Sequence, residues 1–207
     1  MTDYVMIGGG LACAHAAMIL RKADAESAVT IVAAEPELPY TRPELSKGYV
    51  RGEMERAKVF PRDAAWYEAN HIRVLSGTQA TAIHRDSRTV ALEAGGSLHY
   101  DKLLLATGGA VRKARFPGAD LRGIYYLRTL ADSEAIREAA ANAKTAVVVG
   151  GGFIGCELAA SLTQKGVAVS ILLSGAVLLD KQIGNPAGQF LTETFRPKAV
   201  TLVTGDR

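Results

Sequence analysis

Cysteine is scarce in this chain: its 207 residues contain only two, Cys13 and Cys156, and no Cys-x-x-Cys pair. The sequence is therefore not typical of a disulfide scaffold or of a redox-active disulfide. The four histidines are scattered, without the spacing of a metal site, so we expect no bound metal. Each cysteine follows a glycine-rich loop, where a small side chain helps a helix to pack. We expect both thiols to be packing groups.

Long apolar runs and runs of like charge are also absent. The apolar stretches are far shorter than the roughly 20 residues of a membrane-spanning helix, so we expect no membrane span. The net charge is only +3, and no Lys/Arg run with interleaved aromatic residues indicates a nucleic-acid partner. The first strand begins too early for a signal peptide, which predicts a cytoplasmic protein. Nothing in the sequence indicates an oligomeric state.

Glycine, by contrast, is plentiful, and two glycine-rich loops stand out. One is Gly8-Gly9-Gly10, which follows Val5-Met6-Ile7; the other is Gly150-Gly151-Gly152, which follows Val147-Val148-Val149. Each opens an Ala-rich stretch with helical character. In such a loop the first glycine permits a tight turn, and the second lets the backbone approach a pyrophosphate at the helix N-terminus. Two loops of this kind predict two dinucleotide sites, and hence electron transfer between two cofactors.

The third position of each loop must be small, because the helix packs closely on the strand there. The second loop has Gly155 at this position, whereas the first has Cys13, a small departure from the pattern.

The hydrophobic pattern predicts two βαβ beginnings. In the first half we expect strands at 4–7, 29–33, 74–75, 80–84, 89–92 and 98–100, and helices at 10–23, 44–51 and 62–70. In the second half we expect helices at 131–142, 152–165 and 185–195, and strands at 145–149, 167–173 and 199–203. Residues 72–105 are interpreted as an antiparallel excursion that ends in a buried strand, 102–105.

The predicted fold class is therefore α/β. It comprises two Rossmann-like dinucleotide-binding units, each three-layered around a parallel sheet, with an antiparallel β excursion in the first. The second unit ends after too few strands, so we expect the chain to be an N-terminal fragment of a longer protein. The alternative is a natural short form whose sheet is completed by a partner.

Glu35 stands at the end of the second predicted strand. A carboxylate there can accept hydrogen bonds from both hydroxyls of an adenosine ribose; the alternative is a solvated loop charge. The matching segment of the second unit, Leu172-Leu173-Ser174, offers no acid, and nothing there suits a 2′-phosphate. The sequence thus leaves NADH and NADPH as alternatives.

Three segments together resemble a known family. They are Tyr40-x-Arg42-Pro43-x-Leu45-Ser46-Lys47-Gly48-Tyr49, Leu105-Ala106-Thr107-Gly108-Gly109 and Gly150-x-Gly152-x-x-Gly155-x-Glu157. Their order and spacing are similar to those of the FAD-dependent ferredoxin reductases of the putidaredoxin, rubredoxin and rhodocoxin reductase type. These enzymes belong to the pyridine nucleotide-disulfide oxidoreductase superfamily and are related to apoptosis-inducing factor. The resemblance covers essentially the whole chain.

The resemblance implies FAD at the first unit and NAD(P)H at the second. Residues 1–115 would then be the first segment of an FAD-binding domain, and 116–207 an incomplete NAD(P)-binding domain. The cofactor-binding residues that it implies are Gly8, Gly10, Ala12, Glu35, Arg42, Lys47, Ala80, Thr107, Gly108, Arg128, Gly150, Gly152, Phe153, Ile154 and Gly155.

Lys47 and Glu157 are the implied catalytic residues, as an ion pair where the hydride arrives. An ammonium group near the flavin would stabilise the negative charge of its reduced form. A carboxylate beside the lysine would hold it in place and keep it protonated. The alternatives are an ordinary surface lysine and a glutamate favoured by the helix dipole.

The implied activity is hydride transfer from NAD(P)H to FAD, followed by electron transfer to a ferredoxin- or rubredoxin-type acceptor. The lack of a cysteine pair near Lys47 argues against the disulfide-reductase branch. Two alternatives remain: an NADH oxidase or quinone reductase resembling apoptosis-inducing factor, and a catalytically inactive nucleotide-binding fragment.

Overall fold

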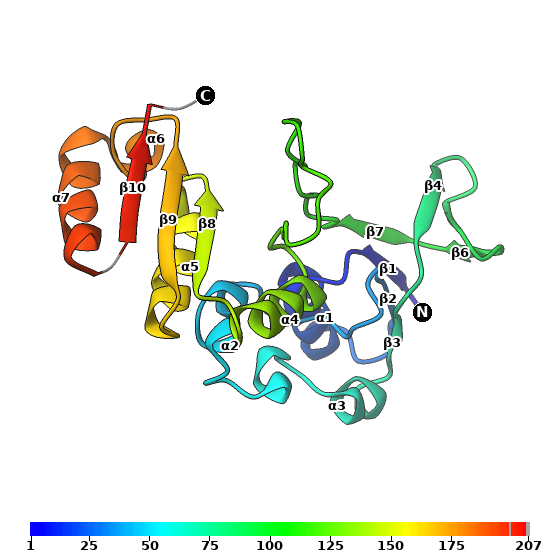
Figure 1. The fold of residues 1–207 in the computed structure, drawn as a ribbon. Helices are drawn as coiled ribbons and strands as arrows, with labels where there is room; N and C mark the ends of the chain where they lie inside the picture. The colour runs from blue at the N-terminus through cyan, green and yellow to red at the C-terminus, as the bar shows by residue number, and fades with distance from the viewer. Residues whose placement is uncertain (199, 206–207) are drawn as a thin grey trace. The chain divides into compact units, whose positions relative to one another are not determined.

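The computed structural model describes residues 1–198 and 200–205 (Figure 1). The chain forms two compact units. The first unit consists of Met1–Thr41 and Arg56–Ala110, and the second of Arg42–Glu55 together with the chain from Val111 onward. The second unit therefore includes a segment, Arg42–Glu55, that a division at residue 115 would assign to the first domain.

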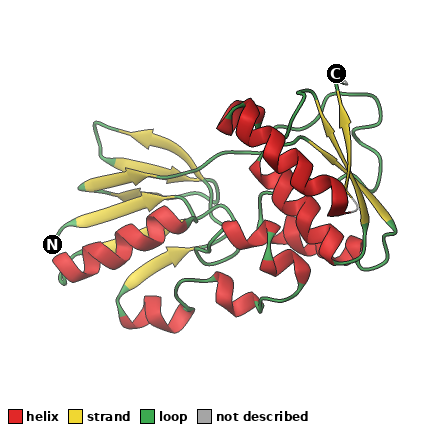
Figure 2. Ribbon diagram, turned by 90° about the vertical axis from the view of Figure 1, so that its left-hand side faces the viewer, coloured by secondary structure: helices red, strands yellow, loops and turns green. Residues whose placement is uncertain are grey.

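A four-stranded parallel sheet forms the centre of the first unit. Its order is β3-β2-β1-β7, with β1 at Asp3–Ile7, β2 at Ala28–Val32, β3 at Ile72–Leu75 and β7 at Lys102–Leu105. Helix α1, Leu11–Ala23, connects β1 to β2, so the first predicted βαβ beginning is confirmed. Helix α3, Ala64–Ala69, precedes β3 (Figure 2).

The assignment of residues 74–75 to the antiparallel excursion is wrong. Strand β3 pairs in parallel with β2, in the register Ile31↔Val74. The chain returns through η2, Arg56–Val59, and α3 before β3 begins, and such a crossover delivers a strand parallel to the one before it. A short apolar run carries no signal of its pairing direction.

The antiparallel excursion itself is confirmed. It is a three-stranded sheet in the order β4-β5-β6, with β4 at Ala80–His84, β5 at Thr89–Leu92 and β6 at Ser97–His99. Gly95 and Gly96 turn the chain between β5 and β6 with φ values of +89° and +82°, in the left-handed region that favours glycine.

The first unit has three layers because side chains alternate along its central strands. From β1, Val5 and Ile7 join a core cluster with Val90 of the antiparallel sheet. Met6 faces the opposite way and packs with Cys13 of α1 and with other residues of a second cluster. The parallel sheet is therefore covered by helices on one face and by the antiparallel sheet on the other.

Strand β7 is not the buried strand that its apolar sequence predicts. It is the last strand in the sheet order, and Leu104 and Leu105 are 38% and 57% exposed. The run Leu103-Leu104-Leu105 shows the hydrophobicity of a central strand, but burial depends on neighbours that periodicity cannot locate.

The second unit is built on a parallel sheet in the order β10-β9-β8. These strands span Val200–Thr204, Ala168–Leu173 and Thr145–Val149. The helices are α2 (Gly48–Arg51), α4 (Leu130–Ala140), α5 (Phe153–Gln164), α6 (Asp180–Ile183) and α7 (Asn185–Phe195), with 3-10 turns η1 at Pro43–Ser46 and η3 at Arg196–Lys198. Helix α6 was not predicted, and Ala199 of the predicted strand 199–203 lies outside the described residues.

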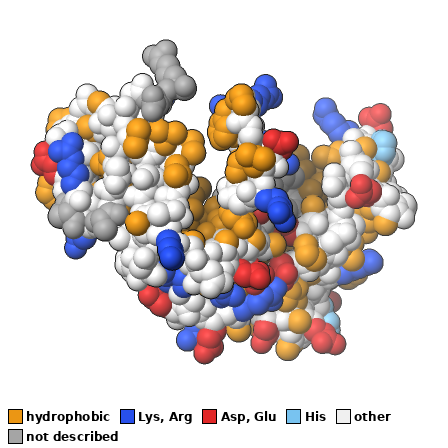
Figure 3. Space-filling view, viewed as in Figure 1, with side chains coloured by type: hydrophobic (Ala, Val, Ile, Leu, Met, Phe, Trp, Pro, Cys, Tyr) orange, Lys and Arg blue, Asp and Glu red, His pale blue; other side chains and the backbone are white. Residues whose placement is uncertain are grey.

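The core of the second unit lies on one face of its sheet. Val169 and Ile171 of β9 pack with Ala159 and Leu162 of α5 in one buried cluster. On the other face Val147 is 67% exposed. Figure 3 shows acidic and basic side chains interspersed on the face that it draws.

A matched pair of valines tests this one-sided core. Val169→Ala, at a site only 2% exposed, should lower the free energy of unfolding by about 2 kcal/mol through lost burial and a cavity. Val147→Ala on the neighbouring strand should cost less than about 0.5 kcal/mol. Urea unfolding of both variants measures the difference, and equal costs would contradict the assignment of the buried face.

Candidate functional site

The first glycine loop has the geometry of a nucleotide cradle. Gly8 has φ +140°, and a Cβ at this position would lie 2.1 Å from the carbonyl oxygen of Ala106. The pairing of β1 with β7 causes this approach, since the Ala106 N–H donates to the Ile7 carbonyl. The structure thereby brings Gly8 next to the segment that contains Thr107 and Gly108. A Cβ at Gly10 would meet no atom within 4 Å, so space is open there for a ligand.

Both helices that follow glycine loops begin with a glycine at the N-cap. Helix α1 starts after Gly10 and α5 after Gly152, and neither start has a side-chain cap. By contrast, Asp63 caps α3 and Thr129 caps α4 with side-chain oxygens. The first N–H groups of α1, which include that of Ala12, and of α5 therefore remain available to a phosphate, as cradle geometry requires.

The third position of the glycine motif is occupied by Gly155 in the second unit and by Cys13 in the first, and the structure explains both residues. A Cβ at Gly155 would lie 2.0 Å from the Gly150 carbonyl oxygen, so the second loop requires glycine there. Cys13, in the first loop, is fully buried and packs in the core of its unit. Burial raises the pKa of both Cys13 and Cys156 to about 11, with the charge of Glu157 adding to the effect at Cys156. Protonated, buried thiols fit the packing role expected of them.

Glu35 follows β2 at the carboxyl end of the sheet. The hydroxyl of the buried Tyr40 donates a hydrogen bond to its carboxylate. Tyr40 also forms a backbone bridge with Gly10 of the cradle. Tyr40 thus links the Glu35 carboxylate to the first glycine loop. That loop is expected to hold the pyrophosphate of the nucleotide whose ribose Glu35 is expected to bind. Ala80 lies in the same unit, partly buried against the core cluster that contains Val5.

The second cradle opens in the same way. Gly150 has φ +108°, and a Cβ at Gly152 would come no closer than 3.8 Å to another atom. Phe153 and Ile154, at the first positions of α5, are both more than half exposed, so they are available to a nucleotide. After β9 the carboxylate of Asp180 lies against Gly175. A Cβ at Gly175 would be only 2.3 Å from Oδ2 of Asp180.

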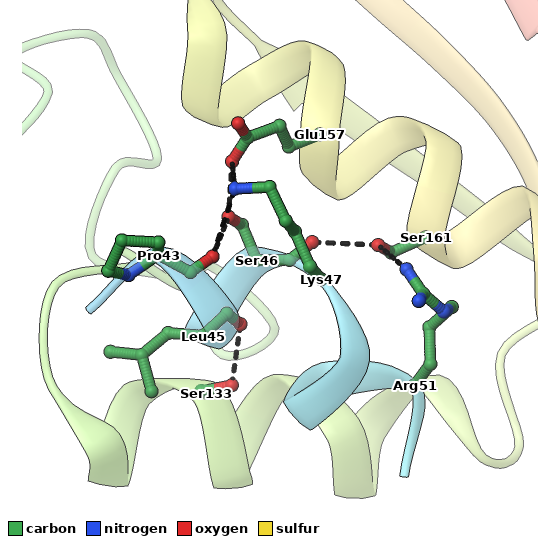
Figure 4. Close-up of polar contacts among 8 residues, drawn as sticks. All are labelled: Pro43, Leu45, Ser46, Lys47, Arg51, Ser133, Glu157 and Ser161. Carbon is green, nitrogen blue, oxygen red and sulfur yellow. Dashed lines mark hydrogen bonds and ion pairs between the residues drawn. The ribbon is translucent and has the colours of Figure 1, made fainter. Parts of the chain in front are cut away.

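Lys47 stands at a break between two short helices. Residues 44–51 were predicted as one helix, but η1 ends at Ser46 and α2 begins at Gly48. Lys47 between them has φ −121° and ψ −119°, outside the helical region. Because of this break, its side chain is directed toward α5 (Figure 4).

The ion pair implied for Lys47 and Glu157 is present. The Lys47 Nζ lies 2.9 Å from Oε2 of Glu157 and also donates to the carbonyl of Pro43 at 3.1 Å. The hydroxyl of Ser46 donates to the same Oε2 at 2.5 Å. The two charged side chains are 39% and 32% exposed, so they are accessible from solvent.

The pKa of Glu157 reflects a balance of opposing effects. Partial burial raises the pKa of this carboxyl. The hydrogen bonds from Ser46 and Lys47, together with the positive charge of Lys47, lower the pKa by more than burial raises it. The net direction is below the ordinary value of a glutamate. Glu157 is therefore a carboxylate at neutral pH, as an ion pair with an ammonium group requires.

Arg42 and Arg128 are also brought together. The guanidinium group of Arg42 donates to the carbonyl of Arg128. The Arg128 N–H in turn donates to Asp132, whose carboxylate belongs to the capping box at the start of α4. The Arg128 backbone is thus held from both sides by polar contacts.

The implied site residues divide between the two units. The first unit contains Gly8, Gly10, Ala12, Glu35, Ala80, Thr107 and Gly108; the second contains Arg42, Lys47, Arg128, Gly150, Gly152, Phe153, Ile154, Gly155 and Glu157. Sequence reasoning did not name Tyr40 and Ser46 as site residues, although both stand in the quoted Tyr40–Tyr49 segment. Their contacts with Glu35 and Glu157 show why they belong to it.

Among the residues that the structure describes, no helix is long and apolar enough to cross a membrane. In the same part of the chain, no group of His, Cys, Asp and Glu side chains has an arrangement that could hold a metal ion.

Comparison with known proteins places the chain in a family of nucleotide-dependent redox proteins. The sequence model of the pyridine nucleotide-disulphide oxidoreductases matches residues 2–207, so the chain belongs to this family. Members of the family use FAD and NAD(P)H. The resemblance that the sequence motifs indicate is thereby confirmed.

Two curated relatives within this family are similar to most of the chain. The ferredoxin--NAD(+) reductase component of the anthranilate 1,2-dioxygenase system of Burkholderia cepacia is 39% identical over 90% of this chain and 46% of its own length. Putidaredoxin reductase of Pseudomonas putida is 35% identical over 98% of this chain and 49% of its own. The chain thus spans about half the length of the curated relatives it matches.

The solved structures agree with the sequence relatives. The covalent putidaredoxin reductase–putidaredoxin complex contains a chain with a TM-score of 0.91 and 35% identity, matched over 100% of this chain and 50% of that one. The predicted α/β fold with Rossmann-like units is confirmed by this likeness.

Two glycine substitutions separate fold from binding in the first cradle. Gly8→Ala should destabilise the protein by on the order of 1–3 kcal/mol, because its Cβ would collide with the Ala106 carbonyl at a strained φ. Gly10→Ala should cost less, at most about 1 kcal/mol for a poorer N-cap, but should weaken FAD binding because the added methyl group fills the space in front of the loop. Urea unfolding and the flavin absorbance retained after desalting measure the two effects. Unimpaired flavin retention by Gly10→Ala would contradict the cradle assignment.

The low pKa of Glu157 predicts a pH dependence of stability. A carboxyl whose pKa falls on folding contributes stability above its unfolded pKa of about 4.3, and this contribution is lost as the pH drops through the folded pKa. Glu157→Gln should therefore be less stable than the unaltered chain at pH 7, and the gap should close in acid. Urea unfolding at several pH values checks this; a gap that is constant with pH would contradict the ion-pair explanation.

Proposed function

We propose that this protein is the nucleotide-binding part of an NAD(P)H-dependent flavoprotein reductase. It would take a hydride from NAD(P)H onto FAD and pass electrons on to a ferredoxin- or rubredoxin-type acceptor. FAD, when bound, supplies the chemistry that joins a two-electron donor to a one-electron acceptor. The acceptor is inferred from the relatives, whose names specify ferredoxin and putidaredoxin.

The observation that carries this proposal is the contact between Lys47 and Glu157. Glu157 lies on α5, the helix that opens at the second cradle, and its carboxylate holds the Lys47 ammonium group. A nucleotide whose pyrophosphate lies at the start of α5 would extend past this pair. This arrangement supports the proposal that a bound nicotinamide nucleotide reaches the two charges.

In the proposed reaction each residue has a physical role. The first cradle and Glu35 would hold FAD, with the Glu35 carboxylate accepting hydrogen bonds from ribose hydroxyls. The second cradle, with Phe153 and Ile154, would hold NAD(P)H. The fixed ammonium group of Lys47 would stabilise negative charge that develops as the hydride arrives. Glu157, kept ionised, would hold that ammonium group in position.

We place this activity in the cytoplasm. The two cysteines are both free thiols, as expected of a protein in reducing surroundings.

Lys47→Ala tests the proposed role directly. With FAD added, the chain should retain a flavin band after desalting, and NADH should bleach it under anaerobic conditions. The variant should retain the flavin but be reduced on the order of 100-fold more slowly, because a fixed charge that stabilises the transition state is lost. Stopped-flow absorbance at the flavin band measures the rate.

Lys58→Ala, at an exposed lysine of η2, is the matched control and should be reduced at the unaltered rate. An unchanged rate in Lys47→Ala would remove Lys47 from the mechanism. Reoxidation of the bleached protein by a ferredoxin, by oxygen or by a quinone distinguishes the proposed acceptor from an oxidase or a quinone reductase.

A further inference from the structure

Two fully buried serines approach the segment that carries Lys47. Ser133 of α4 is 0% exposed and Ser161 of α5 is 1% exposed. The Ser133 hydroxyl donates to the carbonyl of Leu45, and the Ser161 hydroxyl donates to the carbonyl of Ser46, each at 2.7 Å (Figure 4). The two acceptors are consecutive peptide groups that directly precede Lys47.

These carbonyls need donors because the helix stops at this point. A helix leaves its last carbonyl groups without intrahelical partners, and a buried carbonyl without a partner is costly. Since η1 ends at Ser46 and the backbone of Lys47 leaves the helical region, the two carbonyls lie at such an end. The serine hydroxyls therefore stabilise the break itself, and the break is what directs Lys47.

The hydroxyl of Ser161 is also oriented by a second contact. Nη1 of Arg51 lies 3.1 Å from Ser161 Oγ. A guanidinium group can only donate, so the hydroxyl accepts from Arg51 and its own hydrogen is left for the Ser46 carbonyl. Arg51 belongs to α2, on the far side of the break, so the contact links both sides of Lys47 to α5.

Ser161 lies four residues after Glu157 on α5, so the two side chains share one face of the helix. That face therefore holds the Lys47 segment at two points, the Ser46 carbonyl and the Lys47 ammonium group. We propose that Ser133 and Ser161 are positioning residues that set Lys47 and Ser46 against the Glu157 carboxylate. Their importance for catalysis rests on the function proposed above, but the positioning itself does not.

The neighbouring Thr163 shows that this contact is not the default for a hydroxyl on α5. Its Oγ1 donates to the Ala159 carbonyl, within its own helix, at 2.9 Å. A buried serine can satisfy itself in that way too. Ser161 instead donates to a different element, as Ser133 does. Thr163→Ala is therefore a matched control: it removes a hydroxyl from the same helix without touching the Lys47 segment.

The test is a pH titration of Glu157 in the 207-residue chain. NMR of the ¹³C-labelled side-chain carboxyl groups monitors the titration, and the signal of Glu157 is assigned by its loss in Glu157→Gln. In the double variant Ser133→Ala/Ser161→Ala, the pKa of Glu157 should rise toward its ordinary value, because Ser46 and Lys47 are no longer held against it. Thr163→Ala should titrate as the unaltered chain does. An unchanged pKa in a folded double variant, or an equal rise in Thr163→Ala, would overturn the proposal.

Ser161→Cys provides a second test that does not depend on the folding of the double variant. The thiol nearly preserves the buried volume but is a much weaker donor, so the Glu157 pKa should again rise. A folded Ser161→Cys variant with an unaltered titration would also overturn the proposal. Because the titration uses neither FAD nor NADH, it gives its answer even if the proposed reaction fails. If that reaction is present, NADH should also reduce the bound flavin more slowly in Ser161→Cys than in Thr163→Ala.

Discussion

A single carboxylate oxygen organises the charged site of this protein. Oε2 of Glu157 receives both the Lys47 ammonium group and the Ser46 hydroxyl, two donors from adjacent residues. Burial would otherwise favour the neutral acid, and these donors more than offset it. The arrangement needs a backbone that leaves the helical path at Lys47. The site therefore depends on the stability of that break as much as on the charges.

The same physical device appears twice in the chain. In each unit a parallel strand is followed directly by a glycine with positive φ, and the next helix begins without a side-chain cap. Helix N-termini of this kind attract phosphate because their N–H groups and dipole face outward. The units differ at the third position of the motif, where Gly155 is required by a close carbonyl and Cys13 is packed in the core.

Local patterns predicted most of the elements, and pairing explains the errors. The glycine loops, the strand and helix that flank each of them and the antiparallel strands were predicted because their signals lie in short stretches of sequence. Strand β3 was placed in the wrong sheet and β7 in the wrong environment, since both depend on which strands lie beside them. The helix predicted at 44–51 was broken at Lys47, because contacts from α4 and α5 compensate a conformation that propensity disfavours.

The amino-acid sequence by itself determined the two glycine loops, the positions of the Glu35 and Glu157 carboxylates and the family. These are matters of residue type at fixed spacing, and glycine geometry is a local property. Only the tertiary structure decided that Tyr40 holds Glu35, that Ser46 shares an oxygen with Lys47, and that two buried serines hold the turn. Serines that bond to backbone carbonyls of a distant segment leave no pattern in the sequence, because any residue can supply the carbonyl.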